Sequence, residues 1–188
     1  IINKEYPYQT IDSGLFYKKV LNEIKQNKNI QFLKNTDEIN LDNSFIFLLL
    51  ILIQIVIGAF VSGMDAGKIY NSWPLMGNTY FPNDNNVENL FKLSAFSDPS
   101  LVQFIHRNLA YVIGLFYVMI FFKVYKNKII KLYRSVNILG FFIILQIILG
   151  IFTIILGAQI YIAAVHQVSS IFLVTSSIYF FFINTRIN

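Results

Sequence analysis

Four long apolar runs constrain this chain more than any other feature of its sequence. They lie at 44–63, 101–122, 136–156 and 160–183, and each holds few or no charged residues. A helix needs about 20 apolar residues to cross the hydrocarbon core of a membrane. A membrane β-barrel would instead need segments of about ten residues in which apolar and polar side chains alternate. We therefore predict an all-α membrane protein, a four-transmembrane-helix bundle, and exclude a soluble enzyme core.

The charges between these runs predict how the bundle is oriented. Lys and Arg in short loops remain on the cytoplasmic or matrix side of a membrane. The segment 123–134 has five basic residues and no acid, whereas the long segment 64–100 has four acids and two lysines. We therefore place 123–134 inside, 64–100 outside as a long loop between the first two helices, and both termini inside. The net charge of +5 is then mainly an orientation signal, and we expect no nucleic-acid partner.

Residues 1–43 are polar and precede the membrane domain, which we assign to 44–188. They carry six basic and six acidic residues and no visible signal peptide, and the chain opens on Ile rather than Met. We expect a truncated start, with 1–43 forming either a polar N-terminal extension or the loop between two halves of a longer protein.

Two of the apolar runs contain the same polar pattern. Gln54 is followed by Gly58, and Gln146 is followed by Gly150, at an offset of 92 residues. A Gln within a membrane is costly unless it finds a partner, and a Gly lets two helices approach closely. We interpret the pattern as an internal repeat of two helical hairpins. Biased composition with ordinary helix packing is the alternative.

The chain has two histidines, and both lie inside predicted helices. His106 follows Leu101 by five residues, and His166 follows Tyr161 by the same count. Each ring is therefore about 7.5 Å in from the outer end of its helix. Two facing imidazoles at one depth are what a haem iron needs as axial ligands, so we predict that both bind haem iron. A hydrogen bond to a neighbouring helix is the alternative for each ring.

The residues near the histidines suit a flat macrocycle. Arg107 is placed to pair with a haem propionate, or else to extend to the surface as an orientation charge. The neighbours along the two helices are small: Ala110, Gly114, Ala163, Ser169 and Ser170.

Other chemistries lack the residues they need. With no cysteine in the chain, disulfides, iron–sulfur clusters and thiolate nucleophiles are excluded. A zinc site wants three or four ligands, a Ser-His-Asp triad needs a buried acid, and the runs contain no carboxylate. A transporter would be expected to have broken helices with charges at the midplane. A haem held by two histidines is the interpretation that remains.

Three stretches resemble the motifs of the haem A synthase family. They are Gly58 to Pro82, with Ala66, Gly67, Asn71, Pro74 and Met76; Asp98 to Arg107; and Leu145-Gln146 through Gly150 to Ala164-Val165-His166-Gln167. The likeness covers residues from about 50 to 180. It is to the C-terminal half of the family, in its mitochondrial and alphaproteobacterial branch. Ile105 departs from relatives that place an acid there, which puts in doubt a hydrogen bond to an imidazole.

The resemblance implies an eight-helix membrane oxidoreductase of two similar halves, which oxidises a methyl group of haem O to the formyl group of haem A for cytochrome oxidase. It implies that His106 and His166 hold a haem b that transfers electrons, while the other half binds haem O and carries the carboxylate associated with the reaction. No catalytic residue is assigned in this half.

The implied partners are membrane lipid, haem O held by a missing or separate N-terminal half, and an electron donor, with homo-oligomer formation left open. The implied location is the mitochondrial inner membrane or the bacterial cytoplasmic membrane. The rival hypothesis is a non-catalytic b-type cytochrome or membrane assembly subunit that carries electrons or haem for a partner complex. A membrane scaffold without a cofactor leaves the paired histidines unexplained.

Overall fold

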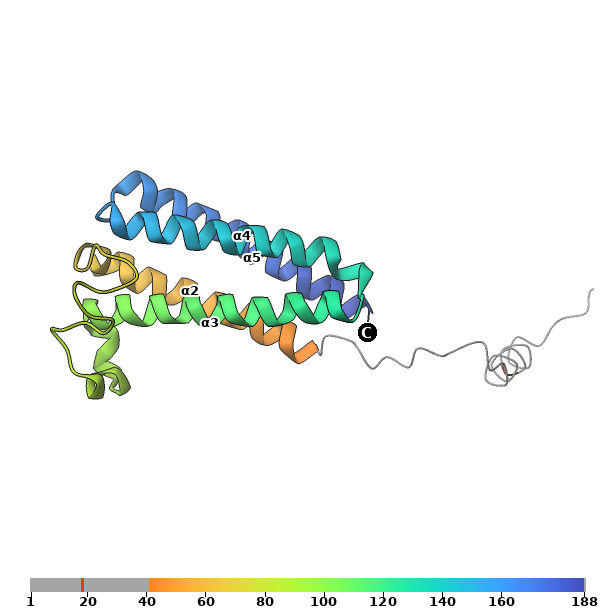
Figure 1. The fold of residues 1–188 in the computed structure, drawn as a ribbon, viewed down its shortest axis with the longest axis horizontal. Helices are drawn as coiled ribbons and strands as arrows, with labels where there is room; N and C mark the ends of the chain where they lie inside the picture. The colour runs from red at the N-terminus through yellow and green to blue at the C-terminus, as the bar shows by residue number, and fades with distance from the viewer. Residues whose placement is uncertain (1–17, 19–40, 188) are drawn as a thin grey trace, which may run out of the picture. The chain divides into compact units, whose positions relative to one another are not determined.

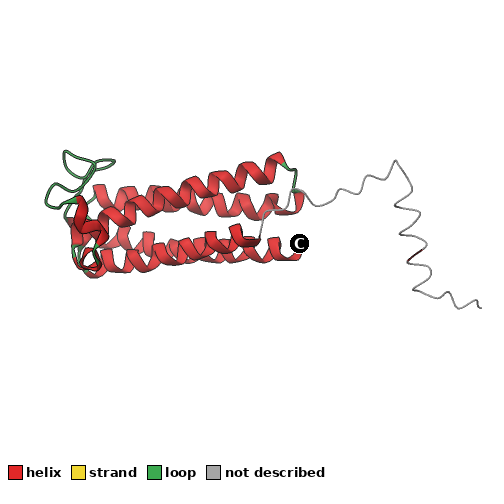
Figure 2. Ribbon diagram, turned by 90° about the horizontal axis from the view of Figure 1, so that it is seen from below, coloured by secondary structure: helices red, strands yellow, loops and turns green. Residues whose placement is uncertain are grey.

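Four long helices make up most of the described protein. The structure, a computed structural model, describes Lys18 and residues 41–187, so the predicted extension or loop over 1–43 lies almost wholly outside the described residues. Within 41–187 the long helices are α2 (Leu41–Gly63), α3 (Pro99–Lys126), α4 (Ile130–Ile155) and α5 (Ile160–Ile187). All four are long and apolar enough to cross a membrane. The predicted all-α, four-helix membrane fold is confirmed (Figure 2).

The link between α3 and α4 is shorter than predicted. Most of the basic segment 123–134 is helical, and only a turn at 127–129 separates the two helices. Lys123 and Lys126 lie in the last turn of α3, where positive charge is favourable beside the negative end of the helix dipole. The charged residues of this segment, whose composition predicts a loop, therefore lie mostly within α3 and α4.

The start of α3 is fixed by Asp98 and Pro99. The Asp98 side chain accepts a hydrogen bond from the Leu101 amide at 3.1 Å, and Pro99 occupies the first turn. An N-cap Asp satisfies one of the free amides at a helix start, and Pro has no amide hydrogen to leave unpaired there. This capping sets the depth of His106, about two turns into the helix.

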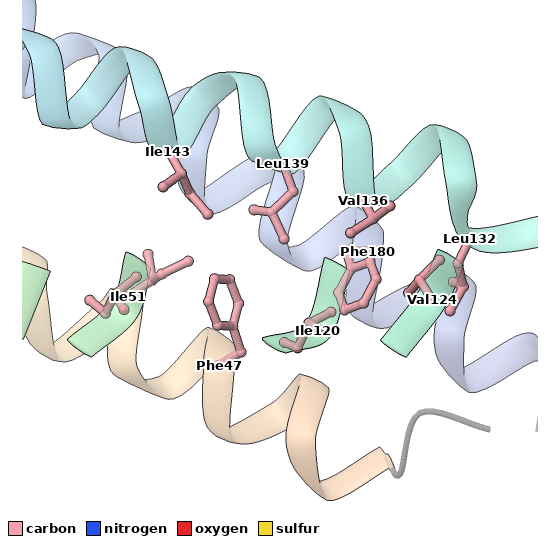
Figure 3. Packing of buried hydrophobic residues seen from close by; sticks show 10 residues of the cluster. Phe47, Ile51, Ile120, Val124, Leu132, Val136, Leu139, Ile143 and Phe180 are labelled. Carbon is pink, nitrogen blue, oxygen red and sulfur yellow. The ribbon is translucent and has the colours of Figure 1, made fainter. Parts of the chain in front are cut away.

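The helices pack as two hairpin-like pairs. Figure 1 shows α2 running beside α3 and α4 beside α5, and the pairs meet where α2 packs on α5 and α3 on α4. A cluster of buried apolar side chains joins the pairs near the α3–α4 turn (Figure 3). Its members are Phe47, Ile51, Ile113, Ile120, Val124, Leu132, Val136, Leu139, Ile143 and Phe180.

This cluster occupies one end of the bundle. On α2 and α4 its members all precede Gln54 and Gln146, and on α3 and α5 they all follow His106 and His166. In a membrane such close packing, rather than escape from water, holds helices together. The cluster therefore anchors the end with the α3–α4 turn and lies entirely on one side of the histidines.

The α2–α3 connection, residues 64–98, lies at the opposite end of the helices from the α3–α4 turn (Figure 1). It contains three short 3-10 helices: η1 (Ala66–Lys68), η2 (Val87–Phe91) and η3 (Leu93–Ser97).

Candidate functional site

Gln54 on α2 contacts both the main chain and the ring of His106 on α3. Its Nε2 donates a hydrogen bond to the His106 carbonyl oxygen at 3.0 Å and lies 3.3 Å from the ring Nε2. The neighbouring helix thus supplies the partner that a glutamine inside a membrane needs.

Gln146 and His166 repeat this relationship in the second pair. Nε2 of Gln146 donates to the His166 carbonyl oxygen at 3.2 Å and to Oγ of Ser169 at 2.9 Å. Oγ of Ser169 in turn donates to the same carbonyl oxygen at 2.9 Å. The predicted repeat is therefore present in the contacts, with one difference: Gln146 reaches a serine where Gln54 reaches an imidazole.

The repeat glycines lie directly against the imidazole rings. A Cβ added at Gly58 would lie 3.1 Å from Cε1 of His106, and one at Gly150 would lie 3.3 Å from Cε1 of His166. Both distances are shorter than ordinary van der Waals contact, so any larger residue would push on the ring. The glycines thus let each imidazole rest on the helix that also supplies its glutamine.

Each histidine has one ring nitrogen free for a further partner. Nδ1 of His106 and Nδ1 of His166 are buried and have no hydrogen-bond partner among the residues that the structure describes. A neutral imidazole keeps a lone pair on one nitrogen, which is what metal ligation requires.

The donor set fits a haem better than a bare metal ion. Among the residues that the structure describes, no three His, Cys, Asp or Glu side chains group to hold a metal. A haem supplies its own equatorial nitrogens and takes two axial ligands from the protein. The two histidines on α3 and α5 are the donors it would use.

The small residues beside the histidines have differing surroundings. Ser169 is buried and hydrogen-bonded to Gln146, so it contributes to helix packing and does not leave open space for a macrocycle. Gly114 faces α4, where an added Cβ would lie 3.9 Å from Ile147, an ordinary contact. Ala110 and Ala163 are half-buried.

Arg107 binds the α2–α3 connection. Nη1 donates to the carbonyl oxygens of Ser72 at 2.9 Å and Leu75 at 3.3 Å, and Nη2 donates to that of Tyr70 at 2.9 Å. The side chain is 6% exposed, so it is not a charge extended to the surface. Its Nε is buried and has no partner within 41–187, and the predicted pairing with a haem propionate stays a prediction.

Two further contacts of the connection were not predicted from the sequence. Gln103, one turn before Arg107, is buried and donates from Nε2 to the same Tyr70 carbonyl at 3.1 Å. Asn71 donates to the carbonyl oxygens of Gly67 at 2.9 Å and of Ile154 on α4 at 3.1 Å. The sequence feature that could have indicated these contacts is the four-residue spacing of Gln103 and Arg107, which places two polar side chains on one face of an apolar helix.

The connection is also bonded to the first turn of α3 through Asp84. Ser100 donates to one Asp84 carboxylate oxygen, and the Tyr70 hydroxyl donates to the other at 3.0 Å. Burial acts to raise the pKa of Asp84, but the hydrogen bonds from Ser100 and Tyr70 outweigh it, and the pKa is lowered. Burial, and then the bond to Asp84, raise the pKa of Tyr70. No sequence periodicity links these three residues.

Comparison with known proteins gives a family match over most of the chain. The cytochrome oxidase assembly protein family matches residues 19–178, starting upstream of the likeness expected from about 50. Heme A synthase of Pelagibacter ubique is 43% identical over 127 residues, covering 68% of this chain and 37% of the relative. That of Wolbachia pipientis wMel is 44% identical over 135 residues, covering 72% and 37%. That of Rickettsia africae is 34% identical over 170 residues, covering 90% and 49%.

No solved structure matches the chain. The chain spans less than half the length of each of these three relatives. The family match nevertheless includes both histidines, both glutamines, both glycines and the whole connection. The predicted resemblance is confirmed: this chain is an integral membrane protein of the cytochrome oxidase assembly family, related to the heme A synthases of alphaproteobacteria.

Proposed function

We propose that this chain is the C-terminal, haem b-carrying half of a haem A synthase. It would take part in oxidising a methyl group of haem O to the formyl group of haem A for cytochrome c oxidase. The names of the relatives support the activity, and the short share of their length that the chain spans supports its assignment to one half.

The observation that carries the proposal is the matched setting of His106 and His166. Each imidazole rests on a glycine, and each histidine carbonyl accepts a hydrogen bond from a glutamine of the adjacent helix. Contacts of this kind hold a ligand in place before the metal group binds and so favour binding. The apolar cluster at the far end fixes the helices that carry the two histidines.

A bound b-type haem would supply a one-electron redox centre. The chain's own residues would position that group: the histidines as axial ligands, and Arg107 through its free Nε as the donor to a propionate. The other donors of Arg107 would keep the connection over this end of the bundle.

The substrate and partners follow from the same proposal. Haem O would bind to the half that this chain does not include. The other proposed partners are an electron donor and membrane lipid. The protein would lie in a bacterial cytoplasmic or mitochondrial inner membrane, and a homo-oligomer is compatible with it. The α3–α4 turn and both termini would lie on the cytoplasmic or matrix side, because the basic residues flank that turn.

A spectrum tests the haem site. The purified chain is expected to show a low-spin b-type reduced-minus-oxidised spectrum, with haem b confirmed as its pyridine haemochrome. His106→Ala and His166→Ala are each expected to lose that low-spin signal. Tyr161→Phe, at an exposed position on the same helix as His166, is the matched control and should keep it. An unmodified chain without haem, or an unchanged spectrum in the double His→Ala variant, would refute the site.

A complementation assay separates the enzyme from its rival. The chain is co-expressed with the N-terminal half of the Pelagibacter relative, and extracted haems are separated by chromatography. Haem A formed only when both halves are present supports the synthase. Bound haem b without any haem A favours a non-catalytic b-type cytochrome or assembly subunit, an alternative that the 37% coverage of that relative keeps open.

A further inference from the structure

The segment of residues 87–97, formed by η2 and η3, carries the most exposed apolar side chains of the α2–α3 connection. Leu93 is 89% exposed and Phe91 is 83% exposed, and Val87 and Phe96 are exposed as well. Neighbouring apolar side chains left this open on a protein surface mark a contact with another apolar phase or partner. We call residues 87–97 the η2–η3 segment.

The η2–η3 segment directly precedes the candidate membrane span of α3. The candidate span of α3 starts at Pro99, six residues after Leu93. At the rise of a 3-10 helix, about 2 Å per residue, Leu93 is within about 12 Å of that start along the chain. Figure 1 shows the segment extending sideways from the start of α3 rather than outward along the helix axes. Its level along the bundle is therefore that of the membrane interface.

The apolar surface of the segment continues onto α2. The ring of Phe96 lies 6.2 Å from the ring of Phe60, centroid to centroid. Phe60 is in the last turns of α2, within its candidate span, and is exposed on the outside of the bundle. A side chain in that position faces acyl chains, so the segment extends a surface that already contacts lipid.

The rest of the segment is suited to an interfacial position. Ala95 is fully buried and fastens η3 to the bundle, while its neighbours Phe91 and Leu93 remain outside. The only charged residues, Glu88 and Lys92, cancel one another. Large apolar side chains such as Phe and Leu beside a lysine are typical of chains that lie in the headgroup and upper acyl region.

We propose that the η2–η3 segment is a membrane-interface anchor whose occupant is lipid. Phe91 and Leu93 insert among the upper acyl chains of the leaflet at the connection end of the bundle, and Lys92 stays at headgroup level. Lipid is the partner because it surrounds four spanning helices at this depth and already contacts Phe60. The anchor holds residues 87–97 of the connection, while Arg107 holds residues 70–75.

Spin labelling tests the proposal at a single labelled site, because the chain has no native cysteine that would have to be replaced first. Leu93→Cys is labelled in the full chain, placed as a single copy in nanodiscs of phosphatidylcholine and phosphatidylglycerol. Collision of the label with oxygen, which concentrates in lipid, is compared with collision with a water-soluble nickel chelate. Asn78→Cys, an exposed polar position of the same connection, is the matched control.

The expected result is strong oxygen and weak nickel relaxation at residue 93, with the reverse at residue 78. Adding Phe91→Asp to Leu93→Cys should raise nickel access, whereas adding Phe91→Leu should not. A label at 93 as open to nickel as that at 78 would overturn the proposal. A label shielded from both reagents would also overturn it, since protein would then cover the segment. Neither outcome depends on haem binding.

Discussion

The side-chain amide of Gln54 donates to the main-chain carbonyl oxygen of His106 at 3.0 Å, and Gln146 makes the equivalent bond to His166 at 3.2 Å. Because the acceptor is the main chain, each bond fixes the helix at the level of its histidine and leaves Nδ1 of the ring without a partner among the described residues. One helix of each pair therefore sets the position of the ligand that the other helix carries.

Replacing Gln54 by Leu should weaken the hold on His106. Leu is similar in size but has no donor, and interhelical hydrogen bonds in membranes contribute roughly 0.5–2 kcal/mol. We expect a lower thermal unfolding midpoint and faster loss of haem to apomyoglobin, both measured in detergent. The matched control is Gln167→Leu, which removes a glutamine bond to Ser62 at an exposed site. Equal effects of the two substitutions would contradict a specific role for Gln54.

Replacing Gly58 by Ala should displace the His106 ring. The added Cβ would lie 3.1 Å from Cε1, closer than the 3.3 Å that Gly150→Ala would give at His166. We expect a shifted Soret band or altered g-values in electron paramagnetic resonance, larger for Gly58→Ala. A Cβ added by Gly63→Ala on the same helix would meet no described residue within 4 Å, so this variant should change neither signal. If Gly63→Ala has the same effect as Gly58→Ala, the ring contact is not the cause.

The spans and the repeat could be predicted from sequence because each rests on a local rule. Apolar runs of membrane-crossing length gave four helices, and the cost of a buried Gln predicted a partner for Gln54 and Gln146. What they bind could not be read from spacing, since the acceptor is a main-chain carbonyl, which every residue has. The extent of α3 past residue 122 was missed because lysines in a last helical turn resemble loop composition.

The role of Arg107 was only partly predictable for a different reason. Its spacing from His106 suggested a site near the haem, but its observed partners are carbonyl oxygens of Tyr70, Ser72 and Leu75. Those residues come from an irregular connection, whose path no periodic pattern encodes. Tertiary contacts of such segments become visible only once the helices that support them are placed.

Arg107→Ala should release the connection from α3. Hydrogen bonds to a charged donor contribute about 1.5–3 kcal/mol each but do not add fully, so we expect local opening to become easier by about 2–4 kcal/mol. Faster chymotrypsin cleavage between Tyr70 and Tyr80 would measure it. Lys68→Ala removes an exposed ion pair with Asp65 and should leave cleavage unchanged. Haem loss from Arg107→Ala with cleavage unchanged would instead favour a direct propionate contact.

Acid should loosen the connection through Asp84. Its pKa is lowered in the folded protein, so ionised Asp84 stabilises the connection above its ordinary pKa of 3.8, and this contribution is lost as the pH falls through the lower folded value. Tyr70 has the opposite sign: its raised pKa adds stability below its ordinary value of 10.0, which is lost as the pH rises through the folded value.

The fluorescence of Trp73 can measure the loosening of the connection, because Trp73 is the only tryptophan of the chain. Its Nε1 donates to the Tyr111 hydroxyl of α3 at 3.0 Å. Its fluorescence during urea titration should show a less stable connection in Asp84→Asn than in the unmodified chain at neutral pH. That difference should narrow as the pH falls from 3.8 through the lower pKa of folded Asp84, because the native carboxylate then also becomes neutral. Glu88→Gln neutralises another exposed carboxylate of the connection and should not reproduce it. A difference that stays constant down to the lowest pH would assign the effect of Asp84→Asn to altered packing rather than to charge.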